Sequence, residues 1–247
     1  MDRERIKKQG IIFLLTVCIV CGVSAIGIVL VQTLQVSEQV LIVRYEDTES
    51  IQEAEKLGVD FLEVGELMTV PLGDDRYRVG AFVTNPNKNW IAQSFEYNVI
   101  ADTVPQRHIA AGVSSVGMAQ DVLLVADVFV DEFALYDVAF VIHQVDWEPR
   151  DSSRAIVRVR NPVFEYGSRN GTFFVEVSGT LVNDSDSFVH EGSLGVIGTD
   201  TNGDTTLLGE TKFYSLHPSS QQRFTLQYEA DEDVVVHDIR FVISSLE

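Results

Sequence analysis

Asn85-Pro-Asn-Lys-Asn-Trp90 decides the fold, because it recurs 98 positions later as Asn183-Asp-Ser-Asp-Ser-Phe188. A later stretch, Asp137-Val-Ala-Phe-Val-Ile142, is matched at a spacing of 101 by Asp238-Ile-Arg-Phe-Val-Ile243. A drift of three residues between the two matches is what one loop insertion produces. Since self-similarity at a fixed period marks repeated structural units, the sequence predicts two copies of one module.

Each copy has the pattern of antiparallel β-structure. Its apolar runs are rich in Val, Ile, Phe and Tyr, largely alternate with polar residues, and end at Gly, Pro, Asn or Asp. A turn is expected at 71–75. Short strands at this spacing predict a sandwich or barrel for each copy. The expected strands are 61–68, 77–83, 95–101, 122–129 and 138–145, then 155–164, 173–181, 193–199, 205–211, 224–228 and 234–243.

Residues 11–31 are expected to form a transmembrane helix. They contain no charged residue over 21 positions, and about 20 apolar residues span a bilayer. Residues 1–10 carry four basic and two acidic side chains, whereas residues 32–247 carry 14 basic and 35 acidic ones, a charge of −21. The positive-inside rule therefore places the N-terminus in the cytoplasm and the rest outside the plasma membrane.

Two alternatives remain for this segment. Val23-Ser-Ala25 resembles a signal-peptidase cleavage site, but the apolar run is longer than the roughly 7–15 residues of a signal-peptide core. A type IV pilin-like leader would be cut after Gly10, yet such a subunit carries a Glu near the start of its mature helix, and 11–16 contains none. An uncleaved anchor is the preferred interpretation.

The anchor has a face of small side chains, because Cys18, Cys21, Gly22 and Ala25 recur at helical spacing. Such faces let membrane helices pack closely, so a homodimer through this face is one possibility and a lone anchor is the other. The chain has no other cysteine. The exported part therefore has neither a disulfide nor a thiol nucleophile.

Composition excludes further classes of protein. The whole chain has 247 residues, a formal charge of −19 and 45% apolar residues. It is apolar enough to bury a core rather than remain a disordered acidic chain. A nucleic-acid partner is not expected, because phosphate binding requires a basic surface.

Pro149 and two Ser in 147–153 mark a short connector between the modules. Such a connector leaves the modules close enough to touch. Residues 50–57 have the composition of one or two helical turns. The expected organisation is a cytoplasmic end at 1–10, a transmembrane helix at 11–31, a membrane-proximal stalk at 32–60, β-sandwich domains at 61–148 and 155–247, and a connector at 149–154.

The residues also resemble a known family. The stretches that carry the resemblance are 77–87, 95–102, 145–147, 157–161 and 179–183. Together they are similar to tandem FxLYD-type proteins, which are single-pass envelope proteins with immunoglobulin-like β-sandwiches. The signature departs at 100–102 (Ile-Ala-Asp) and 198–200 (Gly-Thr-Asp), where the family tends to have Leu-Tyr-Asp. The resemblance implies a fold and a membrane topology and transfers no catalytic residue.

The best metal candidate is Asp200-Thr-Asn-Gly-Asp204, in which Asp200, Asn202 and Asp204 place oxygen ligands at positions 1, 3 and 5 of a calcium loop. The Gly and Glu that such a loop wants at positions 6 and 12 are Thr205 and Thr211. The preferred interpretation is therefore a hairpin turn closed by Asn202-Gly203.

Other motifs give little support for chemistry. The five His residues are spread along the chain without zinc-binding spacing, and no hydrolase, P-loop or dinucleotide motif occurs. Trp90 is matched by Phe188, which favours a shared packing position over a sugar platform, and Trp147 is placed to seal the interface between modules. Asn170 and Asn183 fit the glycosylation sequon, although Asn183 belongs to the repeated turn.

The sequence thus predicts a non-enzymatic envelope protein without a cofactor. In this interpretation the modules hold a surface away from the membrane for contact with envelope proteins, with strand addition at a sheet edge as one contact mode. The alternatives are an adhesive or ligand-binding ectodomain that uses calcium or glycan, and the pilin-like subunit.

Overall fold

The structure, a computed structural model, describes residues 48–101, 105–130, 135–150, 155–231 and 233–246. The expected cytoplasmic end, the transmembrane segment, most of the stalk and positions 151–154 of the connector lie outside these ranges. Within them, no helix combines the length and the apolar character needed to cross a membrane. The described residues all belong to one compact unit.

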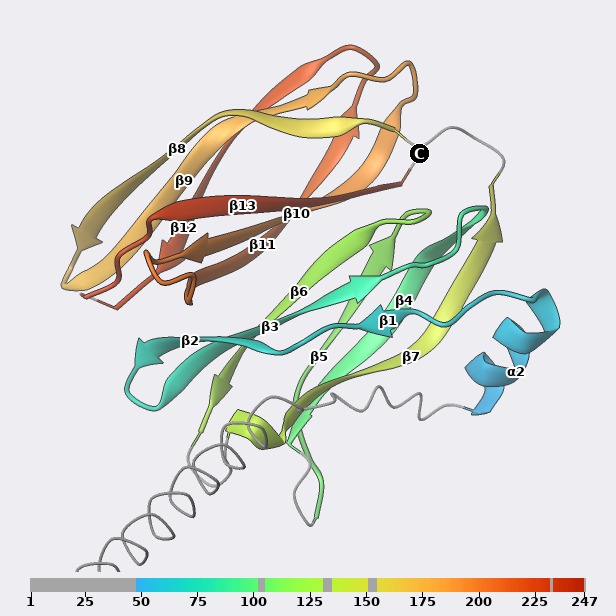
Figure 1. Cartoon of the computed structure of the whole chain (residues 1–247), viewed down its shortest axis with the longest axis horizontal. Coiled ribbons are helices and arrows are strands. Elements are labelled where there is room, and N and C mark those ends of the chain that lie inside the picture. Colours follow the sequence, from blue (N-terminus) through green and yellow to red (C-terminus); the bar gives the residue numbers. More distant parts are fainter. Residues whose placement is uncertain (1–47, 102–104, 131–134, 151–154, 232, 247) are drawn as a thin grey trace, which may run out of the picture. The chain divides into compact units, whose positions relative to one another are not determined.

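The first module is built from two antiparallel sheets (Figure 1). One has the strand order β5-β4-β7, and in the other β3 pairs with β6 on one side and with β1 and β2 on the other. The elements are α2 (Thr48–Leu57), β1 (Glu63–Val64), β2 (Met68–Gly73), β3 (Arg76–Thr84), β4 (Trp90–Ala101), β5 (Arg107–Val116), β6 (Asp121–Phe129), the 3-10 helix η1 (Leu135–Asp137) and β7 (Val138–Pro149).

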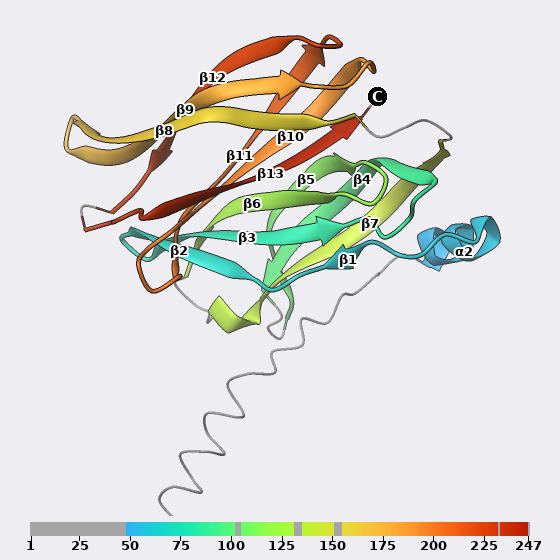
Figure 2. The same ribbon diagram turned by 45° about the horizontal axis from the view of Figure 1, so that its top comes forward.

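The second module repeats this plan (Figure 2). Its antiparallel sheets have the orders β11-β10-β13 and β12-β9-β8, equivalent to β5-β4-β7 and to β6-β3-β2. Its strands are β8 (Val157–Arg169), β9 (Thr172–Asn183), β10 (Val189–Thr199), β11 (Thr205–Leu216), β12 (Gln221–Glu229) and β13 (Asp238–Leu246). The prediction of a mainly β, antiparallel fold is confirmed.

The repeated turn has the same structure in both modules. Asn85 and Asn183 are completely buried. The Nδ2 of Asn85 donates to the carbonyls of Trp90 and Gly117 at 2.8 and 3.0 Å, and the Nδ2 of Asn183 donates to those of Ser187 and Leu216 at 2.8 and 3.2 Å. The Asn85 side chain thus ties the β3–β4 turn to the residue that follows β5, and the Asn183 side chain ties the β9–β10 turn to the last residue of β11.

Each module encloses its own apolar core between its two sheets. In the first, Phe95 and Phe140 from one sheet pack with Leu124 from the other, and all three are inaccessible to solvent. In the second, Leu194 packs with Val177 of the facing sheet. Burial of these alternating side chains is the main stabilising term for each sandwich.

A third apolar cluster joins the two modules face to face. Its side chains come from β2 and β6 on one side and from β10, β11 and β13 on the other, and Figures 1 and 2 show these strands facing each other. The two faces belong to non-equivalent sheets, β2-β3-β6 and β11-β10-β13. The cluster contains Val70, Leu123, Ile197, Leu208 and Val242.

Polar contacts flank this cluster. The Oε1 of Gln120 accepts the backbone N–H of Ser245 at 2.8 Å, and the N–H of Gly117 donates to the Oγ of Ser244 at 3.3 Å. Gln120 and Ser245 are both buried. Because buried backbone groups are costly to leave unpaired, these contacts help to fix the register between the two modules.

Three details differ from the expected elements. Strand β5 was not expected, and Pro71 lies within β2 rather than in the turn, which is made by Asp74 and Asp75 at positive φ. The helical turns expected at 50–57 lie within α2. The side chains of Ala54 and Val59 are buried, so part of the segment assigned to the stalk packs within the compact unit.

Candidate functional site

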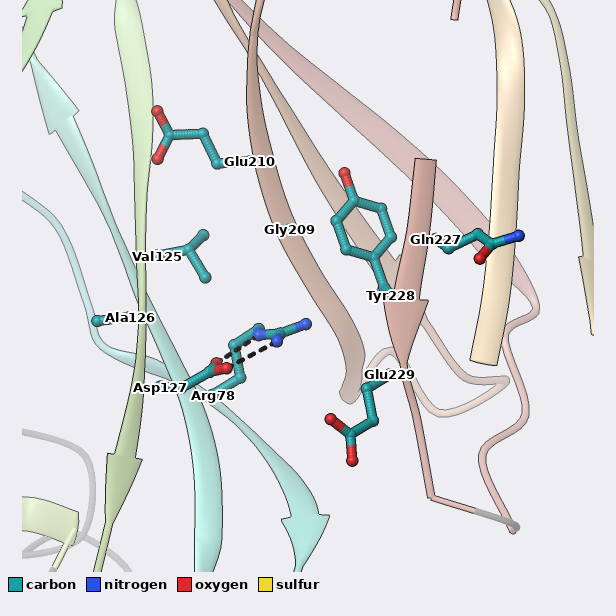
Figure 3. A pocket seen from close by; sticks show the side chains of 9 residues that line it. All are labelled: Arg78, Val125, Ala126, Asp127, Gly209, Glu210, Gln227, Tyr228 and Glu229. Carbon is teal, nitrogen blue, oxygen red and sulfur yellow. Dashed lines mark hydrogen bonds and ion pairs between the residues drawn. The ribbon is translucent and has the colours of Figure 1, made fainter. Parts of the chain in front are cut away.

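A cleft of about 380 Å³ opens between the two modules beside the third apolar cluster (Figure 3). We call it the intermodule cleft. Strands β3 and β6 form its wall on the first module, and β11 and β12 form the wall on the second. The residues that line it are Arg78, Val125, Ala126, Asp127, Gly209, Glu210, Gln227, Tyr228 and Glu229.

Tyr228 reaches this cleft from inside the second module. Its ring belongs to the core between the sheets and passes the backbone of Gly209, where a Cβ atom would come within 1.9 Å of the ring. Only a glycine leaves room for this approach. The residue is 8% exposed, and its hydroxyl has no hydrogen-bond partner within the described part of the chain. Burial raises the pKa of this hydroxyl.

Glu210 follows Gly209 on β11, so its side chain points to the opposite face of the strand. Figure 3 shows its carboxylate directed toward β6, near Val125. The Oγ of Ser193 donates to its Oε1 at 2.9 Å. Burial raises the pKa of the Glu210 carboxyl, against the opposing effects of the Ser193 hydrogen bond and the charge of Lys212. This carboxylate also raises the pKa of Tyr228, which places the two groups within electrostatic reach.

The remaining charges of the cleft are neutralised in pairs. Arg78 forms a two-pronged ion pair with Asp127, from Nε at 2.6 Å and from Nη2 at 2.9 Å. Glu229 of the second module forms an ion pair with Arg76 of the first. Glu210 has no ion pair within 4 Å among the described residues, because the nearby Lys212 bonds Glu191 instead. The uncompensated charge of the cleft is therefore negative and centred on Glu210.

The predicted calcium ligands are engaged in a turn. The Oδ1 of Asp200 accepts the N–H groups of Asn202 and Asp204 at 2.8 and 3.0 Å, and its other oxygen accepts the Nδ2 of Asn202 at 3.2 Å. Gly203 lies at a φ of 90°. This geometry supports the hairpin-turn interpretation. Over the described ranges, no three His, Cys, Asp or Glu side chains gather where they would hold a metal ion.

The aromatic and histidine candidates occupy packing positions. Trp147 packs against the core of the first module. The ring of Phe188 contacts those of His190 and His217, with centroids 4.6 and 5.0 Å apart. These two are the His residues that the structure brings together, through edge contacts with an aromatic ring. The Asn183 amide is bonded to backbone carbonyls, which supports a turn rather than a glycosylation site.

Comparisons with known proteins do not identify a family for this chain. No family model matches it, and no match is found among the curated proteins. Two solved structures are similar at low level. A red sea bream transglutaminase is 14% identical over 82% of this chain, with a TM-score of 0.22, and the chain covers 34% of its length. A tandem CBM22 domain from Paenibacillus barcinonensis Xyn10C is 10% identical over 75% of this chain and 85% of its own, with a TM-score of 0.15. Neither likeness bears on function.

The intermodule cleft was not predicted from the sequence. Its walls come from four strands spread over more than 150 positions, and its key residues match no motif. One local signal is present, since a glycine inside a strand marks a bulge or a close approach, and Gly209 directly follows the apolar pair Leu207-Leu208 within an expected strand. That signal indicates a contact and does not identify Tyr228 as the partner.

Proposed function

We propose that this protein is a membrane-anchored, extracytoplasmic and non-enzymatic scaffold of the cell envelope, with two immunoglobulin-like modules outside the plasma membrane. Its N-terminal end would lie in the cytoplasm, and residues 11–31 would form the anchor. The uncharged 21-residue segment and the charge difference between its two flanks support this topology.

The observation that carries the proposal is the face-to-face packing of the modules. Tandem domains joined only by a linker move relative to each other by default. Here a buried apolar cluster and buried backbone hydrogen bonds connect two non-equivalent sheets. A pair packed in this way presents its outer surfaces at a fixed distance and orientation, which is the property that a scaffold requires.

The edge strand β8 is the contact surface that we assign to a protein partner. It is 13 residues long and lies at one end of the order β12-β9-β8. Val163 and Tyr166 on this strand are 49% and 55% exposed. Exposed apolar side chains beside unpaired backbone groups favour strand addition, and Pro162 together with Arg158 protects the rest of the edge from indiscriminate pairing.

Topology is tested by cysteine labelling of the full chain in a Cys18→Ser/Cys21→Ser background. In spheroplasts, a membrane-impermeant maleimide is expected to label Ser168→Cys, which is exposed on β8, and to spare Gln9→Cys until the membrane is opened. Equal labelling of both positions before opening would contradict the anchored topology.

Function is tested with a photo-crosslinking amino acid at position 166 on β8 and, as a matched control, at exposed position 88 in the first module. We expect one envelope protein to be crosslinked from position 166 alone. Retention on glycan resin without a crosslinked protein would favour an adhesive ectodomain instead. Assembly into pili after cleavage at Gly10 would favour the pilin-like alternative.

A further inference from the structure

The outer face of the β12-β9-β8 sheet carries charges that the fold of one chain leaves unbalanced. Inward side chains of this sheet, such as Val177 and Leu226, pack in the core of the second module. Because side chains alternate along a strand, their neighbours point outward. Figure 2 shows this sheet on the side of the second module that is turned away from the first. The register of the three strands sorts the outward side chains into three rows.

One row is positive. Arg160 on β8 and Arg223 on β12 both pair with Thr180 on β9, so the two arginines flank the same residue. Among the described residues, Arg223 has no ion pair. Arg160 bonds Asp184 at 3.0 Å, but it shares that one carboxylate with Arg158. The positive charge of this row is therefore only partly compensated within the chain.

A second row is negative. Glu165 on β8 lies directly opposite Glu176 on β9, and Gln227 on β12 lies opposite Glu176 on the other side. The Nε2 of Gln227 donates to Oε2 of Glu176 at 2.7 Å, but an amide brings no charge. Neither carboxylate has an ion pair with a described residue. Like charges directly opposite each other on paired strands are destabilising, so this row favours a cation from outside the chain.

The row between these two is neutral. It consists of Val163, Ser178 and Thr225. The side chain of Val163 is 49% exposed. Along β9 the positive row and the negative row each lie two residues from this centre, a distance of about 7 Å on either side. The face is thus positive on one side, neutral in the middle and negative on the other side.

We propose that two copies of this chain pack together through this outer face, related by a two-fold axis that crosses the strands at the neutral row. The rotation makes the strands of the two copies antiparallel and lays β8 over β8. Arg160 of each copy then faces Glu165 of the other, and Arg223 reaches the other copy's Glu176 on the adjacent strand. The exposed Val163 side chains meet at the axis and lose contact with water.

A second copy fits this face better than other partners do. A uniformly acidic or uniformly basic surface would be attracted to one charged row and repelled by the other. A metal ion would find only two carboxylates in the negative row, and no group of three potential ligands occurs among the described residues. A rotated second copy presents the two charged rows in the required opposite order, because an isologous contact is self-complementary.

The contact is independent of the proposed scaffold function and goes beyond it. It uses outward side chains of the sheet, so the unpaired backbone groups at the edge of β8 stay open to a protein partner. Exposed ion pairs each contribute little free energy. We therefore expect a weak and salt-sensitive association, which is best detected by trapping it covalently.

The test is crosslinking of the detergent-solubilised full chain in a Cys18→Ser/Cys21→Ser background. Val163→Cys places one thiol of each copy at the axis, where a short bis-maleimide can bridge the about 10 Å between packed sheets. The matched control is Ser168→Cys, which is also exposed on β8. Its two thiols would lie about 30 Å apart, because each is five residues from the axis.

We expect a covalent dimer from Val163→Cys at low salt, little or none from Ser168→Cys, and a marked loss of the Val163→Cys product at about 1 M salt. Equal crosslinking from the two positions would overturn the proposal. Absence of a dimer from Val163→Cys would also overturn it.

Charge reversal tests the pairing of the rows in the Val163→Cys chain. Arg160→Glu leaves two acidic side chains at these positions of β8, and Glu165→Arg leaves two basic ones. Each variant alone is expected to lose crosslinking about tenfold, because like charges then face each other across the axis. A mixture of the two variants should recover it, since Arg and Glu again oppose each other between unlike copies. The double variant Arg160→Glu/Glu165→Arg should recover it by itself.

Recovery in the mixture also separates a lost contact from a lost fold. A variant that no longer folds would fail in the mixture as well, so failure of both the mixture and the double variant overturns the proposal. Crosslinking of Val163→Cys that is unaffected by either single reversal would show that the copies meet through another surface, such as the small-residue face of 11–31. That result would reject the outer face of β12-β9-β8 as the contact.

Discussion

The ring of Tyr228 on β12 lies against the backbone of Gly209 on β11, at a place where a Cβ atom would come within 1.9 Å of ring carbon Cε1. Two residues from the two different sheets of the second module are thereby made interdependent. Because Gly209 has no side chain, the Tyr228 ring can lie over β11 at the edge of the β11-β10-β13 sheet. The ring covers the backbone there in place of a side chain at position 209. Both the second core and the intermodule cleft depend on this contact.

Gly209→Ala is accordingly expected to destabilise the protein by about 1–3 kcal/mol, because the added methyl group must displace a buried ring. Urea unfolding of the full chain measures the loss. Gly65→Ala is the matched control, since a Cβ there would meet its nearest neighbour at 3.5 Å, which is ordinary contact. Similar stability of Gly209→Ala and Gly65→Ala would show that the ring moves aside without cost.

The apolar cluster is expected to hold the modules together more strongly than the ion pair beside it. Leu123 is fully buried, so Leu123→Ala should cost about 2–5 kcal/mol. Glu229→Gln should cost about 0–1 kcal/mol, because the side chains of Arg76 and Glu229 are 31% and 35% exposed. Urea titrations of both variants rank the two contributions. A larger loss of unfolding free energy in Glu229→Gln than in Leu123→Ala would show that the ion pair, and not the apolar cluster, holds the modules together.

The two buried asparagines should be equally important, since they have equivalent places in the repeat. Asn85→Ala and Asn183→Ala each remove a side chain that bonds several backbone groups, and each should cost about 2–4 kcal/mol if two buried groups lose their partner. Asn89→Ala, at an exposed position of the same turn, should change the unfolding free energy little. A harmless substitution at either buried position would break the proposed equivalence.

Glu210 should make stability depend on pH. Burial raises the pKa of its carboxyl in the folded protein, so the folded state retains this proton to a higher pH than the unfolded state does. The contribution of Glu210 to the unfolding free energy therefore falls as pH rises from about 4.5 through the raised value. Glu210→Gln should be more stable than the original chain at pH 8, and this advantage should shrink toward pH 4. Paired urea titrations across that range measure it, and a constant difference would contradict the burial argument.

The Asp200 turn should act without calcium. Hydrogen bonds from Asn202 and Asp204 lower the pKa of the Asp200 carboxyl, although partial desolvation opposes them as the largest single effect. Its stabilising contribution is therefore present above the ordinary Asp pKa and is lost as pH falls through the lowered value. Asp200→Ala should lower the thermal midpoint equally with calcium and with chelator. A loss that occurs only in calcium would restore the metal-site interpretation.

The repeat could be predicted because side chains within each module impose it. Asn85 and Asn183 recur with their turns, and the alternating strands on both sides follow from the burial of one face. Strand β5 was missed because Ala, Gly and Ser make up much of Arg107–Val116, a composition that gives a weak β signal. The composition of 71–75 predicts a turn that includes Pro71, yet Pro71 lies in β2, which is an edge strand, and an edge tolerates proline.

The stacking of the modules could not be predicted in the same way. Val70 and Ile197 face away from the cores of their own modules, and sequence alternation alone does not say whether such side chains meet solvent or another sheet. The intermodule cleft depends on that stacking, because β3 and β6 of one module and β11 and β12 of the other form its walls. No signal within one module identifies Glu210 and Tyr228 as residues of the cleft.

The use of non-equivalent sheets at the module interface also decides whether the stack of modules could continue. A two-fold arrangement would have subjected the same face of both halves to the same packing constraint. Here the face of β2-β3-β6 is covered in the first half, while its counterpart, β8-β9-β12, is free to carry polar residues such as Arg223, Thr225 and Gln227. The second half thus ends the stack, as a polar terminal repeat ends a solenoid. The contact that joins the two modules is therefore not available for the addition of a further module of the same kind.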